Sequence, residues 1–174
     1  MNVMLDLETM GNGPQAAIVA IGAVEFSLET GDLGSEFYAP VSLASAAQAG
    51  GEMDASTVLW WMQQSDEARA LFKVPGRPLA DALQAFTQWV GNHGTYDGVC
   101  VWGNGATFDN VILASAYRRL NAPRPWPFWG DRCYRTVKAM HPNVPLTRVG
   151  VHHNALDDAK SQALHLIAML KPTS

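Results

Sequence analysis

The residues best suited to chemistry in this 174-residue chain form three short acidic groups that lie far apart in the sequence. In the first, Asp6 and Glu8 are two residues apart in a stretch with alternating apolar residues, so on a strand both side chains leave the same face. Two buried carboxylates on one strand face need a positive partner. Oxygen-binding cations such as Mg²⁺ and Mn²⁺ are suitable partners, although a solvent-exposed edge strand would also tolerate the pair.

The second group is centred on Asp109, which follows a short apolar stretch and a turn bracketed by Gly103 and Gly105. An aspartate at this place lies in the first turn of a helix, where the helix dipole alone would favour it. The turn lacks the Gly-Lys-Ser/Thr of a phosphate-binding P-loop and the glycine spacing of a dinucleotide fingerprint. These two kinds of nucleotide site are therefore excluded.

The third group is His153 with Asn154, Asp157 and Asp158. Asn154 is expected to cap a helix whose first turn contains both aspartates. His153 precedes this helix and can reach over a site that Asp158 lines. A surface histidine beside a charged helix start is the simpler alternative.

Taken in order, the three groups resemble the DEDD exonuclease superfamily. The matching motifs are D-x-E at Asp6, Asn-x-x-x-Phe-Asp ending at Asp109, and H-x-A-x-x-D ending at Asp158. His153 stands five residues before the last aspartate, as in the histidine (DEDDh) branch, and Asn154 stands where the other branch has tyrosine. Residues 6–11, the short length and two adjacent tryptophans are similar to a clade that contains exodeoxyribonuclease VIII-like proteins and a mycobacterial 3′→5′ exoribonuclease.

The resemblance implies a metal-dependent 3′→5′ exonuclease that releases nucleoside 5′-monophosphates. Two divalent cations, Mg²⁺ or Mn²⁺, would be held by Asp6, Glu8, Asp109 and Asp158. His153 would accept the proton of the attacking water.

The same resemblance chooses between neighbouring residues. The family spacing selects Asp158 as the metal ligand and leaves Asp157 as a charge at the helix start, so an alanine at position 157 should keep most of the activity. It likewise selects His153, and not His152, as the base.

Four residues are expected to contact the substrate, two directly after the first motif and two within the second. Thr9 and Met10 would contact the terminal nucleotide, with Met10 against its base, and Asn104 and Phe108 would shape the pocket. For Phe108 and the Trp60–Trp61 pair, packing in the core is the preferred interpretation and base stacking is the alternative.

The charge distribution is compatible with a nucleic-acid partner. The net charge is −4, but residues 118–148 contain seven basic residues and one acid, so this segment carries about +6 and the rest about −10. The expected partner is the 3′ end of single-stranded DNA or RNA, or a 3′ overhang, and the sequence does not decide between the two sugars. A catalytically silent nucleic-acid-binding module and a metal-dependent phosphohydrolase of a small nucleotide are the alternatives; relatives suggest a homodimer.

The elements that must position these groups indicate an α/β protein. Apolar alternation and turns predict three strands joined by short turns, and longer periodicity predicts helices with one more strand between them. The strands cover residues 2–7, 17–26, 35–41 and 97–102; the helices cover 54–70, 79–90, 108–120, 135–140 and a last one after Asn154 that Pro172 should end. The resemblance implies an RNase H-like fold, a five-stranded mixed sheet flanked by helices, as one exonuclease domain over residues 1–174.

The rest of the sequence bears on location. It has no apolar run long enough for a membrane span and no secretory leader, and its two cysteines lack metal-type spacing. We therefore expect a cytoplasmic protein, encoded by a bacterium or a phage, with no membrane partner.

Overall fold

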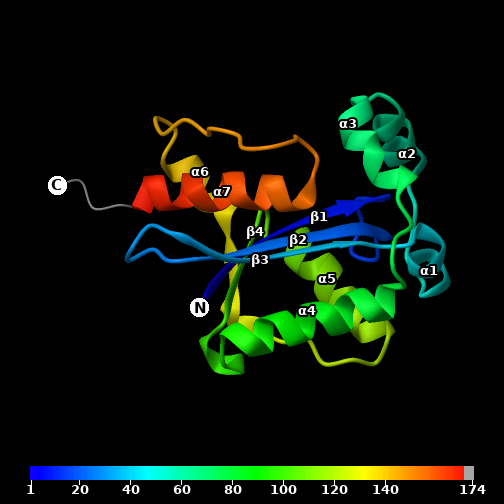
Figure 1. The fold of residues 1–174 in the computed structure, drawn as a ribbon, viewed down its shortest axis with the longest axis horizontal. Coiled ribbons are helices and arrows are strands. Elements are labelled where there is room, and N and C mark those ends of the chain that lie inside the picture. Colours follow the sequence, from blue (N-terminus) through cyan, green and yellow to red (C-terminus); the bar gives the residue numbers. More distant parts are fainter. Residues whose placement is uncertain (171–174) are drawn as a thin grey trace.

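A five-stranded mixed sheet forms the centre of the molecule, in a computed structural model that describes residues 1–170 (Figure 1). The order of the strands is β3-β2-β1-β4-β5. β1 pairs antiparallel with β2 and parallel with β4, β2 pairs antiparallel with β3, and β4 pairs parallel with β5. The bounds of the strands are β1 Asn2–Thr9, β2 Ile18–Phe26, β3 Leu33–Pro40, β4 Cys100–Gly103 and β5 Asp131–Cys133.

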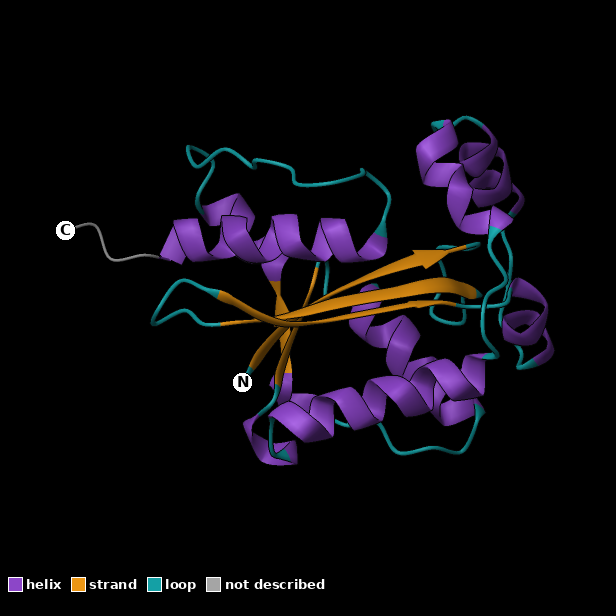
Figure 2. Ribbon diagram, viewed as in Figure 1, coloured by secondary structure: helices purple, strands orange, loops and turns teal. Residues whose placement is uncertain are grey.

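Helices cover both faces of this sheet (Figures 1 and 2). α6 and α7 lie on one face, α4 and α5 lie on the other, and α1, α2 and α3 stand beyond the end of β1. The bounds of the helices are α1 Leu43–Gln48, α2 Ala55–Met62, α3 Asp66–Arg69, α4 Leu79–His93, α5 Asp109–Arg119, α6 Tyr134–Met140 and α7 Ala155–Leu170.

The two faces of the sheet bury separate hydrophobic clusters. Val3, Leu5 and Leu7 of β1 pack with Phe86 of α4 in the larger cluster. Met4 packs with Leu166 of α7 in the smaller one. Because alternate residues of β1 enter opposite clusters, Asp6 and Glu8 continue the Met4 side and point toward α7.

α7 approaches the sheet closely at Gly22, the partner of Asp6 in the register of β1 and β2. A Cβ atom at Gly22 would lie 2.1 Å from the backbone carbon of Ala155, so this strand position admits only glycine with the helix where it is. The contact places the first turn of α7, with its aspartates, directly over the carboxylates of β1.

The predicted α/β class and the five-stranded mixed sheet are confirmed, and most predicted elements exist with shifted ends. Two short elements, α1 and β5, were not predicted. The strand expected at 97–102 starts later, because Tyr96–Gly98 forms a 3₁₀ turn. Pro172, expected to end the last helix, lies outside the described residues.

The helix expected over residues 54–70 is wrong as one continuous element. α2 ends at Met62, α3 begins after Ser65, and a 3₁₀ turn follows over Ala70–Lys73. The side chain of Ser65 accepts a hydrogen bond from the amide of Ala68 and so starts a new helix. Within residues 1–170, no helix has both the length and the apolar character that crossing a membrane requires.

Candidate active site

Asp6, Glu8 and Asp158 meet above the sheet although they come from opposite ends of the chain. One carboxylate oxygen from each lies within 4.8 Å of the others. Asp6 and Glu8 leave the same face of β1, and Asp158 reaches them from the first turn of α7. Both Glu8 and Asp158 are buried. This is the oxygen donor set that Mg²⁺ or Mn²⁺ prefers.

Asp109 lines the same cavity and is held by backbone amides, but among the described residues it is not one of the carboxylates whose oxygens lie within 4.8 Å of one another. Its Oδ1 accepts a hydrogen bond from the amide of Leu7 at 3.2 Å, and its Oδ2 accepts one from the amide of Asn104 at 2.9 Å. It is the first residue of α5 and is 2% exposed. The turn before α5 therefore fixes the carboxylate of Asp109 against the strand that carries Asp6 and Glu8.

A glutamine that the sequence analysis did not select supports Asp6. The Nε2 of Gln162 donates to the Oδ1 of Asp6 at 2.7 Å, and Gln162 lies one helical turn after Asp158 on the same face of α7. The i, i+4 spacing from Asp158 was the signal that could have identified it. Its Oε1 is buried and has no hydrogen-bond partner among the described residues.

The crowding of carboxylates makes their ionisation unfavourable. Burial, with the charges of Asp158 and Asp109 added, raises the pKa of Glu8 to about 8. Burial and the neighbouring carboxylates also raise the pKa of Asp6 well above its ordinary value. Burial raises the pKa of Asp109 to about 7, although its backbone hydrogen bonds oppose the shift. Such a cluster suits divalent cations, whose charge would stabilise the ionised carboxylates.

Both oxygens of Asp158 already have partners. Nη1 of Arg148 lies 2.7 Å from its Oδ1 in an ion pair, and the amide of His153 donates to its Oδ2 at 3.0 Å. The Arg148 side chain is 46% exposed, so only its tip enters the site. Arg148 thus supplies a positive charge to the cluster from the loop before α7.

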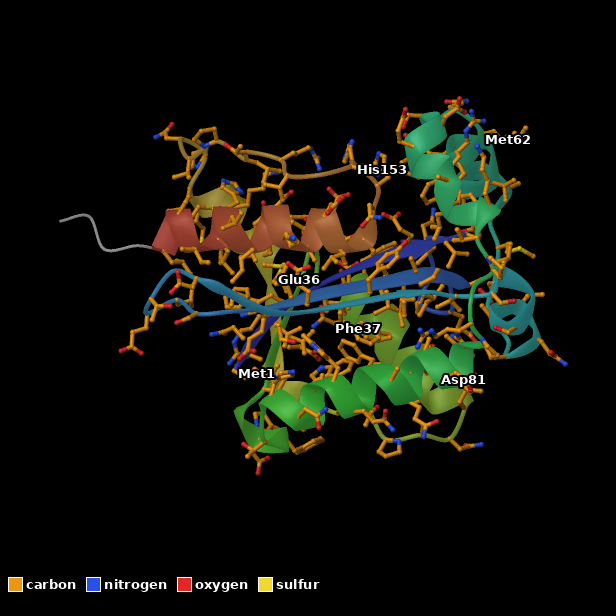
Figure 3. The ribbon with its side chains drawn as sticks, viewed as in Figure 1. Met1, Glu36, Phe37, Met62, Asp81 and His153 are labelled. Carbon is orange, nitrogen blue, oxygen red and sulfur yellow. The ribbon has the colours of Figure 1, made fainter. Side chains whose placement is uncertain are left out.

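His153 lies in the loop before α7, on the side that faces α2 (Figure 3), and both its backbone and its ring are constrained. Its φ is 64°, a left-handed conformation that is unusual for a residue with a side chain. Its ring stacks on that of His152 with centroids 3.7 Å apart and meets the ring of Trp60 edge-on at 4.8 Å. Burial, followed by the charge of His152, lowers the pKa of His153, which favours a neutral imidazole near pH 7.

The loop that carries His153 is tied to Asp157. Oδ2 of Asp157 accepts a hydrogen bond from the amide of Val151 at 2.8 Å, and Asn154 caps α7 by accepting from the amides of Leu156 and Asp157. Gly150 has φ +67°, and a Cβ there would lie 2.2 Å from the Asp157 carboxylate. The predicted cap is confirmed, and Asp157 lies against the loop while Asp158 faces the cluster.

The carboxylates line a cavity of about 320 Å³ with room for a small ligand. Thr9, Asn104 and Phe108 are among its lining residues, as are Trp60 and Trp61. Trp60 is 40% exposed, whereas Trp61 is buried and its Nε1 donates to the carbonyl of Thr9 at 2.9 Å. Core packing, the preferred interpretation of the pair, therefore fits Trp61, while Trp60 forms part of the cavity wall.

Met10 lies in a different environment from the one expected. It is 8% exposed and belongs to the larger hydrophobic cluster, outside the residues that line the cavity. The chain bends after β1, where the amide of Met10 donates to the carbonyl of Ala17, and this turns the side chain into the core. A contact between Met10 and a base finds no support in this arrangement.

Comparison with known proteins agrees with this geometry. Residues 1–170 match the family model described as the 3′-5′ exoribonuclease Rv2179c-like domain. A curated protein of Enterobacteria phage T4, described as an exodeoxyribonuclease, is 27% identical over 155 residues, which cover 76% of this chain and 68% of the phage protein.

Solved structures with similar folds are nucleases as well. The nuclease domain of 3′hExo, a DEDDh family member bound to rAMP, has a TM-score of 0.64 at 16% identity, covering 98% of this chain and 91% of that one. Exonuclease X bound to 5′ overhanging duplex DNA has a TM-score of 0.61 at 17% identity, with 99% and 93% covered. E. coli Exonuclease I bound to an oligonucleotide has a TM-score of 0.59 at 18% identity, with 98% and 41% covered. These likenesses establish an RNase H-like fold.

Proposed function

Because the chain belongs to the family of 3′-5′ exoribonuclease Rv2179c-like domains, and is thus a 3′-5′ exonuclease, we propose that it shortens single-stranded nucleic acid or 3′ overhangs at the carboxylate cluster described above. The observation that carries this proposal is the convergence of Asp6, Glu8 and Asp158 within 4.8 Å in a lined cavity. The products would be nucleoside 5′-monophosphates, released by one exonuclease domain.

Asp6, Glu8, Asp109 and Asp158 would hold two divalent cations, Mg²⁺ or Mn²⁺. Such ions, when bound, supply Lewis-acid stabilisation of the attacking and leaving oxygens of a phosphodiester. The raised pKa values of Glu8 and Asp109 support this assignment, because an empty cluster of carboxylates is costly to ionise. Gln162 orients the Asp6 carboxylate through its hydrogen bond.

His153 would accept the proton of the attacking water. Its lowered pKa keeps the ring neutral near pH 7, as a general base requires. The edge contact with Trp60 and the amide hydrogen bond to Asp158 hold the ring at the cavity mouth. His152 stacks on this ring, lines the same cavity and is exposed, which fits a supporting role.

Thr9, Asn104 and Phe108 would contact the terminal nucleotide, since all three line the cavity. We also infer that the protein is cytoplasmic and is encoded by a bacterium or a phage. Its two free cysteines support the cytoplasmic location. We propose in addition that two copies of the chain form a homodimer, and sedimentation velocity would test this oligomeric state.

The test is degradation of matched 5′-labelled single-stranded RNA and DNA with Mg²⁺, Mn²⁺ or EDTA. We expect a metal-dependent ladder that shortens from the 3′ end, and the strand that is degraded faster identifies the preferred sugar. Asp6→Ala should abolish the ladder, because it removes a ligand from the centre of the cluster. Asp66→Ala, on exposed α3, is the matched control and should leave the ladder unchanged.

A protein that leaves both strands intact with either metal would refute the proposal. Release of phosphate from a small phosphomonoester, without action on oligonucleotides, would instead identify a phosphohydrolase.

A further inference from the structure

The structure separates the seven basic residues of segment 118–148 into two sets, which the sequence could not do. Arg135, Lys138 and Arg148 line the active-site cavity. The other four lie elsewhere or are held by local partners. Arg118 and Arg124 line a hollow beside α5. Arg119 donates to the carbonyl of Ala49, and Arg132 donates to the carbonyl of Trp129. Only the first set can face a strand that enters the catalytic centre.

A second hollow, of about 560 Å³, adjoins the active-site cavity along α6. The two hollows share Asn104, Arg135 and Lys138, so they adjoin at these residues, and we call the two together the groove. The second hollow continues over Ala139, His141, Pro142 and Val144, and no acidic residue lines it. The groove therefore changes from strongly acidic at the carboxylates to basic along α6.

Arg135 is fixed at the junction of the two hollows. Its Nη2 donates to the carbonyl of Asn104 at 2.7 Å, and its guanidinium lies over Gly105, where a Cβ would be 3.3 Å from the guanidinium carbon. Gly105 has φ +107°, which also favours glycine. The amide of Asn104 donates to Asp109, so one turn positions both a catalytic carboxylate and a phosphate-binding cation. The other guanidinium N–H groups remain available for an anion.

Lys138 follows Arg135 by three residues and lies on the same side of α6. It is exposed and has no ion-pair or hydrogen-bond partner among the described side chains. An unpaired lysine beside small and apolar residues suits a backbone phosphate with its sugar.

We propose that the groove along α6 binds the strand on the 5′ side of the scissile bond, with Arg135 and Lys138 contacting successive backbone phosphates. This inference rests on the proposed exonuclease function and adds the direction in which the strand leaves the site. The terminal nucleotide occupies the cavity beside the carboxylates, and the upstream strand passes over α6.

The experiment compares two substrates in wild type and Lys138→Ala. The p-nitrophenyl ester of thymidine 5′-monophosphate offers a single nucleotide and ends before α6, whereas a ten-nucleotide single strand reaches it. We expect Lys138→Ala to raise KM for the ten-nucleotide strand severalfold and to raise KM for the ester by a smaller factor, because the ester has no upstream phosphate. Arg118→Ala is the matched control, because it removes an exposed positive charge from the opposite face of the sheet.

Salt dependence provides a second readout. Each lost phosphate contact should reduce the slope of log affinity against log salt by about 0.7 for a single strand. Affinity is measured by fluorescence anisotropy with a strand whose 3′-terminal linkages are phosphorothioates. Lys138→Glu should weaken binding further than Lys138→Ala.

An unchanged KM and salt slope in both Lys138 variants, or an equal loss in Arg118→Ala, would overturn the groove while leaving the exonuclease intact. Failure of the exonuclease itself is distinguished by the wild type, which would then degrade neither substrate.

Discussion

Arg148 and Asp158 form the contact at this site that combines a partly exposed positive group with a buried metal-ligand candidate. Nη1 of Arg148 lies 2.7 Å from the Oδ1 of Asp158, so the arginine would compete for this oxygen with the cations proposed above. The Arg148 side chain is 46% exposed and that of Asp158 is 11% exposed, so solvent screens the ion pair mainly on the arginine side. Arg148 therefore holds Asp158 in place until a stronger cation is present.

Arg148→Ala should consequently tighten metal binding. Partly exposed ion pairs are worth about 0.2–1 kcal/mol, so the affinity for Mn²⁺ should rise by up to about fivefold. Isothermal titration with Mn²⁺ measures this directly, without reference to turnover. Arg69→Ala, which breaks the surface pair with Asp66, is the control and should leave the affinity unchanged. Weaker Mn²⁺ binding in Arg148→Ala would mean that the arginine orients Asp158 for the metal.

The two histidines provide a second prediction at this scale. His153→Ala should lower kcat by roughly 10²–10⁴-fold, as expected for loss of a general base. His152→Ala should have a much smaller effect, because that ring is exposed whereas His153 is half-buried. Steady-state kinetics on the same oligonucleotide compares them. A larger loss in His152→Ala would show that the base is assigned to the wrong residue.

At the scale of elements, sequence spacing predicted the positions of the candidate catalytic residues more reliably than the structure of the segments between them. Asp6 and Glu8 share a face because a strand repeats every two residues, and Asn154 caps α7 because its side-chain oxygen satisfies helix amides. Both features depend on near neighbours in the sequence, so spacing alone predicts them.

What the sequence could not provide depends on contacts between distant segments. Arg148 lies in a loop without periodicity, so nothing in its neighbourhood indicates its partner Asp158. Trp60 and Trp61 are adjacent in α2 and both line the cavity, yet Trp60 is 40% exposed and Trp61 is buried, because the helix rotates each residue by about 100° relative to the last. Met10 was misplaced for a related reason, since its direction is set by pairing with Ala17.

The close approach of α7 to β2 gives a prediction for this scale. Gly22→Ala would place a methyl group 2.1 Å from the backbone of Ala155, so α7 must shift away from β1. We expect a loss of about 1–3 kcal/mol in the free energy of unfolding, together with weaker metal binding, because Asp158 moves with the helix. Urea unfolding and Mn²⁺ titration measure the two effects.

Gly13→Ala is the matched control for this change, since a Cβ at Gly13 meets no atom within 4 Å. It should leave both the stability and the metal affinity unchanged. If Gly22→Ala lost stability but kept its Mn²⁺ affinity, the position of α7 would not control the site.

At the scale of the whole molecule, the charge pattern links stability to metal and pH. The net charge of −4 is the sum of a basic segment and a strongly acidic remainder, and part of the acidity is concentrated on buried carboxylates. A substrate phosphate must approach these carboxylates, and cations remove the repulsion that would otherwise oppose it. The proposed groove along α6 would then attract the rest of the strand through Arg135 and Lys138.

The raised pKa values predict how the metal-free protein responds to pH. Glu8 has a pKa of about 8 in the folded state and an ordinary value near 4.5 when unfolded. Between these values the folded state binds more protons than the unfolded state, so stability falls as pH rises. In EDTA, Tm should therefore decrease from pH 5.5 to pH 8, and Mg²⁺ or Mn²⁺ should restore much of it at pH 8, because cations stabilise the ionised carboxylates.

Glu8→Gln tests whether the cluster causes this behaviour. The amide has nearly the same shape and no charge, so the variant should have a higher Tm than the wild type in EDTA at pH 8 and a smaller difference at pH 5.5. Its response to added metal should also be reduced. Glu29→Gln, in the exposed turn between β2 and β3, is the control and should follow the wild type at both pH values. Were Glu8→Gln to show the same pH dependence as wild type, the loss of stability would arise from groups outside the carboxylate cluster, and the electrostatic argument for cations at this site would fail with it.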